Sequence, residues 1–274
     1  MKIEGLRQIL VEELSKLKEG ETVKLSQLGY NGKLLDKLLF DYFEINNEVY
    51  KEFSLYIEEI LNKIDFTCIN FDNFKCSGFD FTGLKGISIN PQKIYEKNLC
   101  GANCNGVFFS GVFDDVMINN TNFKGSKNAV IDPQKIYHKS LVDCVFTDVD
   151  FNFSFHNCCI SGSDFTGSTG VKLYPSALFD KRMNHTKLNG VVILGNFEGV
   201  DIQGTDFTGS KRARINPQLI KDKNLSGTNC CDVEFIGSFD GVKTLDTEFQ
   251  GSNYQDIECI EDDFRERLKQ LIKK

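Results

Sequence analysis

Apolar side chains recur every five residues along most of the chain, with one four-residue step at the same place in each repeat. One unit runs Leu99, Cys104, Phe109, Phe113, Ile118 and Phe123, and the pattern returns 42 residues later. Neither the 3.6-residue helix period nor the two-residue strand period produces this spacing. It is expected of a chain that turns a corner every five residues and points one side chain inward per side. Four sides make a coil of about twenty residues, so 42 residues make two coils and a small insertion.

The 42-residue step is kept strictly by two kinds of residue. Five phenylalanines follow it (Phe81, Phe123, Phe165, Phe207, Phe249), and so do all four prolines (Pro91, Pro133, Pro175, Pro217). A fixed period of this size is the mark of a repeat architecture. We expect the phenylalanines to stack as an aromatic ladder inside the molecule, beside a second ladder of Phe71, Phe113, Phe155, Phe197 and Phe239.

The central apolar residue often follows Asp or Asn, with a small residue one place earlier. This holds for Thr121-Asn122-Phe123, Ser163-Asp164-Phe165, Thr205-Asp206-Phe207 and Thr228-Asn229-Cys230. The pattern resembles the pentapeptide-repeat family over about residues 65–260. The resemblance implies a mainly β protein, a right-handed quadrilateral β-helix. The chain departs from the family motif where valine takes the small position (Val107, Val149, Val191, Val233).

The insertion begins in three repeats with Asn or Asp before proline: Asn90-Pro91, Asp132-Pro133 and Asn216-Pro217. An N-capping side chain before a proline predicts one helical turn, and these turns should stack as a ridge along one corner. The third copy, Tyr174-Pro175, lacks the cap, so we expect it to be looser. Gly83, Gly125, Gly167 and Gly209 follow the ladder phenylalanines, where a corner needs unusual backbone angles.

The two ends of the chain do not follow the 42-residue repeat. Residues 1–64 predict a small α+β domain that includes a strand-like segment at 22–28, and residues 261–274 predict a C-terminal capping helix with acids first and bases last. The first domain has some similarity to a winged helix. It holds 9 Lys and Arg against 12 Asp and Glu, which is unfavourable for nucleic-acid binding. We interpret it as a cap or a partner-docking domain.

Composition indicates a cytoplasmic protein. Of the ten cysteines, several replace core residues: Cys104 and Cys230 stand where other repeats have Phe146 and Leu188. Reduced, buried thiols are therefore favoured over disulfides. The repeated C-x-x-C spacing of structural zinc is missing, so no metal is expected. No apolar run approaches the ~20 residues of a membrane span, and the first residues do not resemble a secretory signal.

Charged residues outside the core also recur at the 42-residue spacing. Two acidic columns flank the ladders: Asp80, Asp164, Asp206 and Glu248 in one, and Asp72, Asp114, Glu198 and Asp240 in the other. Asn122 interrupts the first column and His156 the second. A basic ridge is predicted near the insertion from Lys135, Lys139, Lys211, Arg212 and Arg214. These eight acids and five bases are the candidate partner-binding residues.

No catalytic constellation is predicted, and no cofactor, because the three histidines (His138, His156, His185) occupy unrelated positions and no nucleotide or metalloprotease motif occurs. Three hypotheses remain. The resemblance implies an inhibitor or protector that mimics DNA through its acidic faces and acts on a nucleic-acid enzyme, DNA gyrase-like or a nuclease. Alternatively, residues 1–64 bind the partner and the rod is a spacer, or the basic ridge binds a phosphate-bearing small molecule. The resemblance also leaves a homodimer open.

Overall fold

The computed structural model describes residues 23–24, 64–67 and 71–256. This part of the chain is mainly β, as the sequence predicted, and its strands are very short. They are β1 (Val23–Lys24), β2 (Ile64–Asp65), β3 (Ser88–Ile89), β4 (Phe108–Phe109), β5 (Ala129–Ile131), β6 (Val149–Phe151), β7 (Lys172–Leu173), β8 (Val192–Ile193), β9 (Arg214–Ile215), β10 (Glu234–Ile236) and β11 (Asn253–Asp256).

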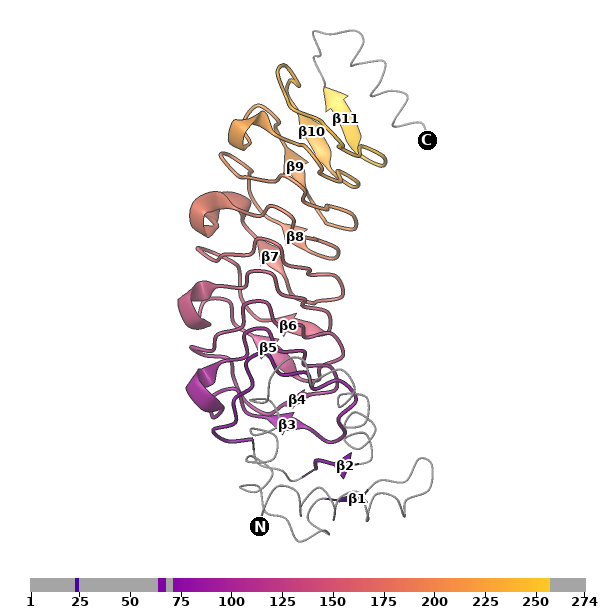
Figure 1. The fold of residues 1–274 in the computed structure, drawn as a ribbon. Helices are drawn as coiled ribbons and strands as arrows, with labels where there is room; N and C mark the ends of the chain where they lie inside the picture. Colours follow the sequence, from indigo (N-terminus) through magenta and orange to yellow (C-terminus); the bar gives the residue numbers. More distant parts are fainter. Residues whose placement is uncertain (1–22, 25–63, 68–70, 257–274) are drawn as a thin grey trace, which may run out of the picture.

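All strand pairs are parallel, and each strand from β3 onward pairs with a neighbouring turn of the chain. One column of single bridges shows the repeat most clearly: Asp80 pairs with Asn103, and Asn103 pairs with Asn122. The chain therefore returns beside itself first at Asn103 and again at Asn122, and the first of these two coils is the longer. Each 42-residue step therefore contains two parallel bridges of this column. Successive coils lie one above another along a long axis (Figure 1).

The core is aromatic, and its rings pack mainly within one coil. Phe155 meets Phe165 edge to face at 5.3 Å between ring centroids, and Phe151 lies 5.0 Å from Phe155 and 5.9 Å from Phe165. The same triad is built by Phe109, Phe113 and Phe123, and by Phe235, Phe239 and Phe249. Burial of each ring contributes about 2–3 kcal/mol to stability.

The predicted phenylalanine ladder is composite, because the coil between two ladder residues contributes its own side chain. Phe146 lies between Phe123 and Phe165, stacked at 5.9 Å on one and 5.1 Å on the other. By the same register, Cys104 follows Phe81 in the column and Leu188 follows Phe165. Successive ladder phenylalanines are thus two coils apart, about 9.6 Å at the ordinary strand spacing.

The small residue two places before the central one joins neighbouring coils. The buried Thr121 hydroxyl donates to the carbonyl of Leu99 (2.8 Å), and the Thr205 hydroxyl donates to that of Met183 (2.8 Å). The Cys144 thiol donates in the same way to Ile118 (2.8 Å). A larger side chain would separate the coils, and an apolar one would leave the bond unmade.

The corners use the left-handed backbone region. Gly83, Gly125, Gly167 and Gly209 have φ of +79°, +78°, +80° and +72°, which confirms the special conformation predicted for them. Glycine adopts this region without the penalty that a Cβ imposes. Asp148 and Asp232 occupy the same corner in other coils, with φ of +68° and +65°.

Little of the two ends is described. Within residues 1–64, β1 pairs in parallel with β2, so the strand-like segment at 22–28 does contribute a strand beside the start of the stack. The rest of the α+β domain and the C-terminal capping helix at 261–274 lie outside the described residues. In the part of the chain that is described, no helix has the length and apolar character needed to cross a membrane.

Candidate functional site

The insertion forms a projecting turn in every second coil, which we call the ridge: residues 91–97, 133–139, 175–181 and 217–223. It starts as the sequence predicted, with a side-chain cap. Asn90 Oδ1 accepts from the Gln92 N–H (3.0 Å), and the Oδ1 atoms of Asp132 and Asn216 do the same for Gln134 and Gln218. A reverse turn follows rather than the expected helical turn, because the Asn90 carbonyl accepts from Lys93 and the chain then extends.

The 3₁₀ elements of the ridge come mostly after that turn. They are η2 (Tyr95–Lys97), η3 (Tyr137–Lys139), η4 (Pro175–Ala177), η5 (Phe179–Lys181) and η6 (Lys221–Lys223). The uncapped copy, expected to be looser, is the one with a 3₁₀ turn at its proline. These elements project along one side of the stack (Figure 1).

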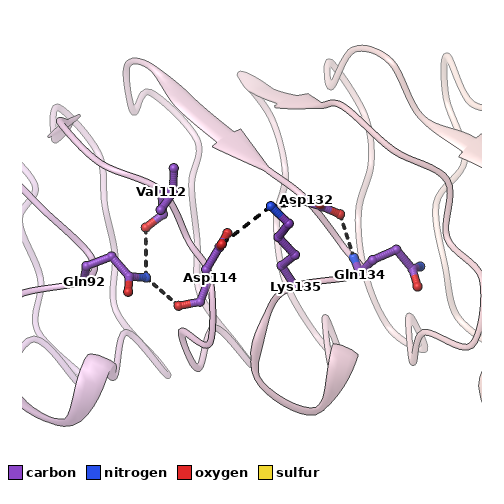
Figure 2. Close-up of polar contacts among 6 residues, drawn as sticks. All are labelled: Gln92, Val112, Asp114, Asp132, Gln134 and Lys135. Atoms are coloured by element: carbon purple, nitrogen blue, oxygen red, sulfur yellow. Dashed lines mark hydrogen bonds and ion pairs between the residues drawn. The ribbon is translucent and has the colours of Figure 1, made fainter.

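A glutamine after the proline ties the ridge to the next coil. Gln92 Nε2 donates to the carbonyls of Val112 and Asp114, as Figure 2 shows. Gln134 donates in the same way to the carbonyls of Ser154 (2.9 Å) and His156 (2.8 Å), and Gln218 to those of Ser238 and Asp240. The primary amide supplies two donors, so one side chain satisfies two backbone acceptors. The sequence analysis did not predict this repeated link.

The third copy has different residues at the same places, and they compensate for one another. Ser176 stands where the others have glutamine, and its backbone N–H bonds the Asn196 carbonyl (3.2 Å). Tyr174 replaces the cap and stacks on His156 at 4.5 Å between ring centroids. His156 stands where other repeats have an acid, and Tyr174 stands where other repeats have a cap. In the sequence these two replacements look unrelated, but in the structure their rings contact each other.

The tip of the ridge carries exposed aromatic rings on a fixed backbone. Tyr95, Tyr137 and Phe179 are 48%, 40% and 47% exposed. The two residues after each ring are left-handed: φ is +52° and +47° at Glu96 and Lys97, and the other copies agree within a few degrees. Such a conformation costs a non-glycine residue of the order of 1 kcal/mol. The same left-handed backbone therefore follows an exposed aromatic ring in three of the ridge copies.

The first acidic column does not form a continuous negative surface. The intervening coils place Asn103, Val145, Lys187 and Asn229 between its positions, in bridge register, and Asn122 takes one of the column positions itself. Lys187 lies between Asp164 and Asp206 and binds Asp164 at 3.0 Å. Burial raises the pKa of Asp164, but hydrogen bonds from Thr166 and Lys187 outweigh it and hold that pKa below its usual value.

These acids also have a local structural role. The Oδ1 atoms of Asp80, Asp164 and Asp206 each accept from the backbone N–H two residues on, at 2.9–3.0 Å. Asn122 makes the same bond to Lys124 (3.0 Å). Asp and Asn are interchangeable here because either oxygen closes the turn.

The second acidic column alternates with lysine in the N-terminal half. Lys93 lies 3.5 Å from Asp72, and Lys135 lies 3.6 Å from Asp114, the pair drawn in Figure 2. Lys135 also lies 3.9 Å from Asp132. Exposed pairs of this kind contribute about 0–1 kcal/mol each, but they neutralise the column locally. Glu198 and Asp240, further along, contribute backbone carbonyls to Lys181 and Gln218.

The predicted basic ridge divides into two groups. Lys135 and Lys139 belong to the ridge, where Lys139 Nζ donates to Gln134 Oε1 (3.0 Å). Lys211, Arg212 and Arg214 belong to the strand face at β9: Lys211 is in register with Val192, and Arg214 binds Glu234 at 3.2 Å. The five bases do not share one column.

The three histidines lie in different surroundings and do not meet one another. His138 lies flat against Tyr137 (3.9 Å), and His185 occupies a left-handed corner (φ +57°). His156 Nδ1 lies 2.7 Å from Ser154 Oγ, the contact of a base with a hydroxyl nucleophile. Its ring is stacked on Tyr174, and no described carboxylate bonds its other nitrogen. Likewise, no group of three metal-ligating side chains occurs within the described ranges.

Cysteines of the described chain are free thiols, and Cys76, Cys104, Cys144, Cys158 and Cys230 are buried, as predicted. Burial raises the pKa of Cys76, Cys144 and Cys158 to about 12. Cys68 and Cys259 lie outside the described residues.

These pKa values predict two classes of thiol reactivity. Because the thiolate is the nucleophile, a pKa near 12 leaves roughly 1 in 10,000 molecules reactive at pH 8. The half-buried Cys100, Cys159 and Cys231 should therefore be alkylated first, and Cys144 only on unfolding. Timed iodoacetamide labelling with peptide mass spectrometry measures this site by site. Early labelling of Cys144 under native conditions would contradict its burial.

Comparisons with protein-family models and with curated proteins gave no match to this chain. The ridge is therefore judged as a binding surface from its own residues.

Proposed function

We propose that the protein is a non-enzymatic interaction protein that binds a protein partner along its length. In this proposal the stacked coils are the right-handed quadrilateral β-helix that the pentapeptide-repeat resemblance implies. The rod is then a rigid scaffold that sets the spacing of its outward side chains. The proposal rests on the ridge, which repeats exposed aromatic rings at one position of alternate coils. Tyrosine and phenylalanine are enriched at protein interfaces, and here they repeat at equivalent positions of the ridge.

The acidic columns are a weaker candidate for the binding face. Mimicry of DNA needs closely spaced negative charge, since duplex DNA carries one charge per ~1.7 Å of its axis. Here the acids of each column lie two coils apart, about 9.6 Å, and Lys187, Lys93 and Lys135 lie among them. Direct nucleic-acid binding is disfavoured as well, because the whole chain carries a net charge of −7.

One set of variants distinguishes the faces. The protein is used to capture partners from the cells that make it, with chemical crosslinking and with or without competing DNA. Changing Tyr95, Tyr137 and Phe179 together to alanine is expected to reduce recovery of the partner at least tenfold. Changing Asp164 and Asp206 to asparagine and Glu248 to glutamine removes the charges but keeps the oxygens that close the turns at Asp164 and Asp206, and it should leave recovery unchanged.

The opposite result would favour the acidic faces, above all if DNA competes for the partner. Retention by both variants, with loss on deletion of residues 1–63, would place binding in the N-terminal domain and reduce the rod to a spacer. Melting temperatures of the variants serve as the folding control.

A further inference from the structure

The spacing of the ridge rings restricts what can bind along them. Tyr95, Tyr137 and Phe179 occupy the same place in η2, η3 and η5, each one full repeat, or two coils, from the next. With coils about 4.8 Å apart, neighbouring rings repeat at about 9.6 Å. The fourth ridge copy has Lys221 at this place, so the aromatic series has three members.

The intervening coils leave the rings apart from one another. The intervening coils have no projecting turn at the corresponding corner. The chain turns there through one left-handed residue per coil, which is Asp115, Asn157 or Gly199. No ring contact joins Tyr95, Tyr137 and Phe179 to each other within the described chain. A ligand must therefore meet the rings one at a time, at intervals of about 9.6 Å.

Among regular polypeptide conformations, only one presents equivalent side chains at that interval. A β-strand repeats on one face every ~6.6 Å, and an α-helix repeats every ~5.4 Å per turn or every ~10.5 Å at the seventh residue. A polyproline II helix has three residues per turn and rises ~3.1 Å per residue, so its equivalent residues recur every ~9.3 Å. Over the two intervals of the ridge, the polyproline II mismatch is about 0.6 Å and the helix mismatch about 1.8 Å.

From this match we infer that the ridge binds a proline-rich segment in the polyproline II conformation, with one proline against each ring. The inference rests on the proposed function, since it names the partner's binding segment. Aromatic side chains are the usual surface for such segments, which lose little entropy on binding because their conformation is preformed. Seven residues, with proline at the first, fourth and seventh, span the three rings.

Charge adds a preference at the positions between the prolines. A lysine follows two residues after each ring: Lys97, Lys139 and Lys181, with Lys223 in the fourth copy. Their ammonium groups already meet acceptors, Asp115 at 3.8 Å, Gln134 Oε1 at 3.0 Å and the Glu198 carbonyl at 3.0 Å. Glu96 and Asp180 precede Lys97 and Lys181, so only the central copy, with His138 before Lys139, carries a lysine without an adjacent acid. An acidic residue of the segment is therefore favoured beside the central ring.

The test uses the full chain and a fluorescent nine-residue peptide, three copies of Pro-Ala-Glu, measured by fluorescence anisotropy. A peptide of the same composition with prolines two and four residues apart is the spacing control. The proline-every-third peptide is expected to bind at least tenfold more tightly. The variant with alanine at Tyr95, Tyr137 and Phe179 should lose this binding, whereas alanine at the exposed Phe108, Val112 and Phe153 should keep it.

A gain of binding provides the sharper check. Lys221→Tyr adds a fourth ring in register, so a twelve-residue peptide with four such prolines should bind several-fold more tightly, and the nine-residue peptide should be unaffected. Equal binding of both spacings, or binding retained by the ridge variant, would overturn the inference. If the ridge variant loses the cellular partner but no peptide binds, the polyproline conformation is wrong and the proposed function stands.

Discussion

Replacing Phe165 by alanine is expected to lower the free energy of unfolding by about 3–5 kcal/mol. The side chain is 1% exposed and its ring meets Phe146 at 5.1 Å, Phe155 at 5.3 Å and Phe151 at 5.9 Å between centroids. It joins two aromatic arrangements, the stack between coils and the edge-to-face triad within a coil. The hole cannot collapse easily, because hydrogen bonds between coils fix the distance of the walls.

The position of Phe165 in the middle of the stack adds a second expectation. Each coil touches only its neighbours, so a weakened coil reduces the coupling between the two halves. Urea unfolding of Phe165→Ala, followed by tyrosine fluorescence and circular dichroism, should become broader or resolve into two steps. Phe153→Ala is the matched control, since that ring is 56% exposed and its loss should change stability by less than about 0.5 kcal/mol. Equal stability of the two variants would contradict the packing of Phe165.

The parts of the fold that the sequence predicted are those set by local rules. One inward side chain per five residues, a left-handed corner after the ladder phenylalanine and a side-chain cap before three of the four prolines all depend on a few neighbouring residues. Gly125 and the Asp132-Pro133 cap are examples, and the structure places both as expected. The mainly β character follows from them, because each coil must bond to the next.

What failed was the comparison of positions one full repeat apart, since these belong to alternate coils. Phe81 and Phe123 look like neighbours in the sequence, yet Cys104 lies between them in the column, and Lys187 lies between Asp164 and Asp206. The true register requires the lengths of the two coils, and these are unequal. The apolar spacing from Cys104 to Phe123 already gives the length of the shorter coil, but the ladder and the acidic column were built from the 42-residue period alone.

The candidate site was signalled in the sequence but not interpreted. Glutamine follows proline in three of four repeats, and an aromatic residue stands four places after proline in three of four. The role of the glutamine was missed because its acceptors are backbone carbonyls of the next coil. Every residue type has a backbone carbonyl, so such a partner leaves no pattern in the sequence. The rings were missed because a tyrosine on a turn gives no sign of its exposure until the left-handed backbone at Glu96 or His138 is known.

Gln134→Ala is expected to destabilise the protein by about 2 kcal/mol, because it removes both donors from the Ser154 and His156 carbonyls. The third ridge copy supplies a matched control. Ser176 occupies the equivalent position and bonds the next coil through its backbone, so Ser176→Ala should change stability by less than about 0.5 kcal/mol. Chemical unfolding of the two variants measures the difference. Equal effects would show that the glutamine link contributes nothing.

Gln134→Glu makes the same link depend on pH. A carboxylate would face two carbonyl oxygens at the distances where the amide now donates, 2.9 and 2.8 Å, so its folded-state pKa should rise above the usual ~4.3. Lys139 Nζ, now bound to Gln134 Oε1, opposes this rise from a half-buried position, but it is one partner against two carbonyl oxygens in direct contact. A raised pKa means that the protonated form is favoured in the folded state.

The variant should therefore be nearest to the wild type below about pH 4 and should lose stability as pH increases through the raised pKa. The loss amounts to ~1.4 kcal/mol for each pH unit by which the folded-state pKa exceeds that of the unfolded chain. Unfolding free energies of both proteins from pH 3.5 to 8 test the sign. A variant that instead gains stability relative to the wild type with rising pH would mean that Lys139 dominates and that the two carbonyls are not the partners of residue 134.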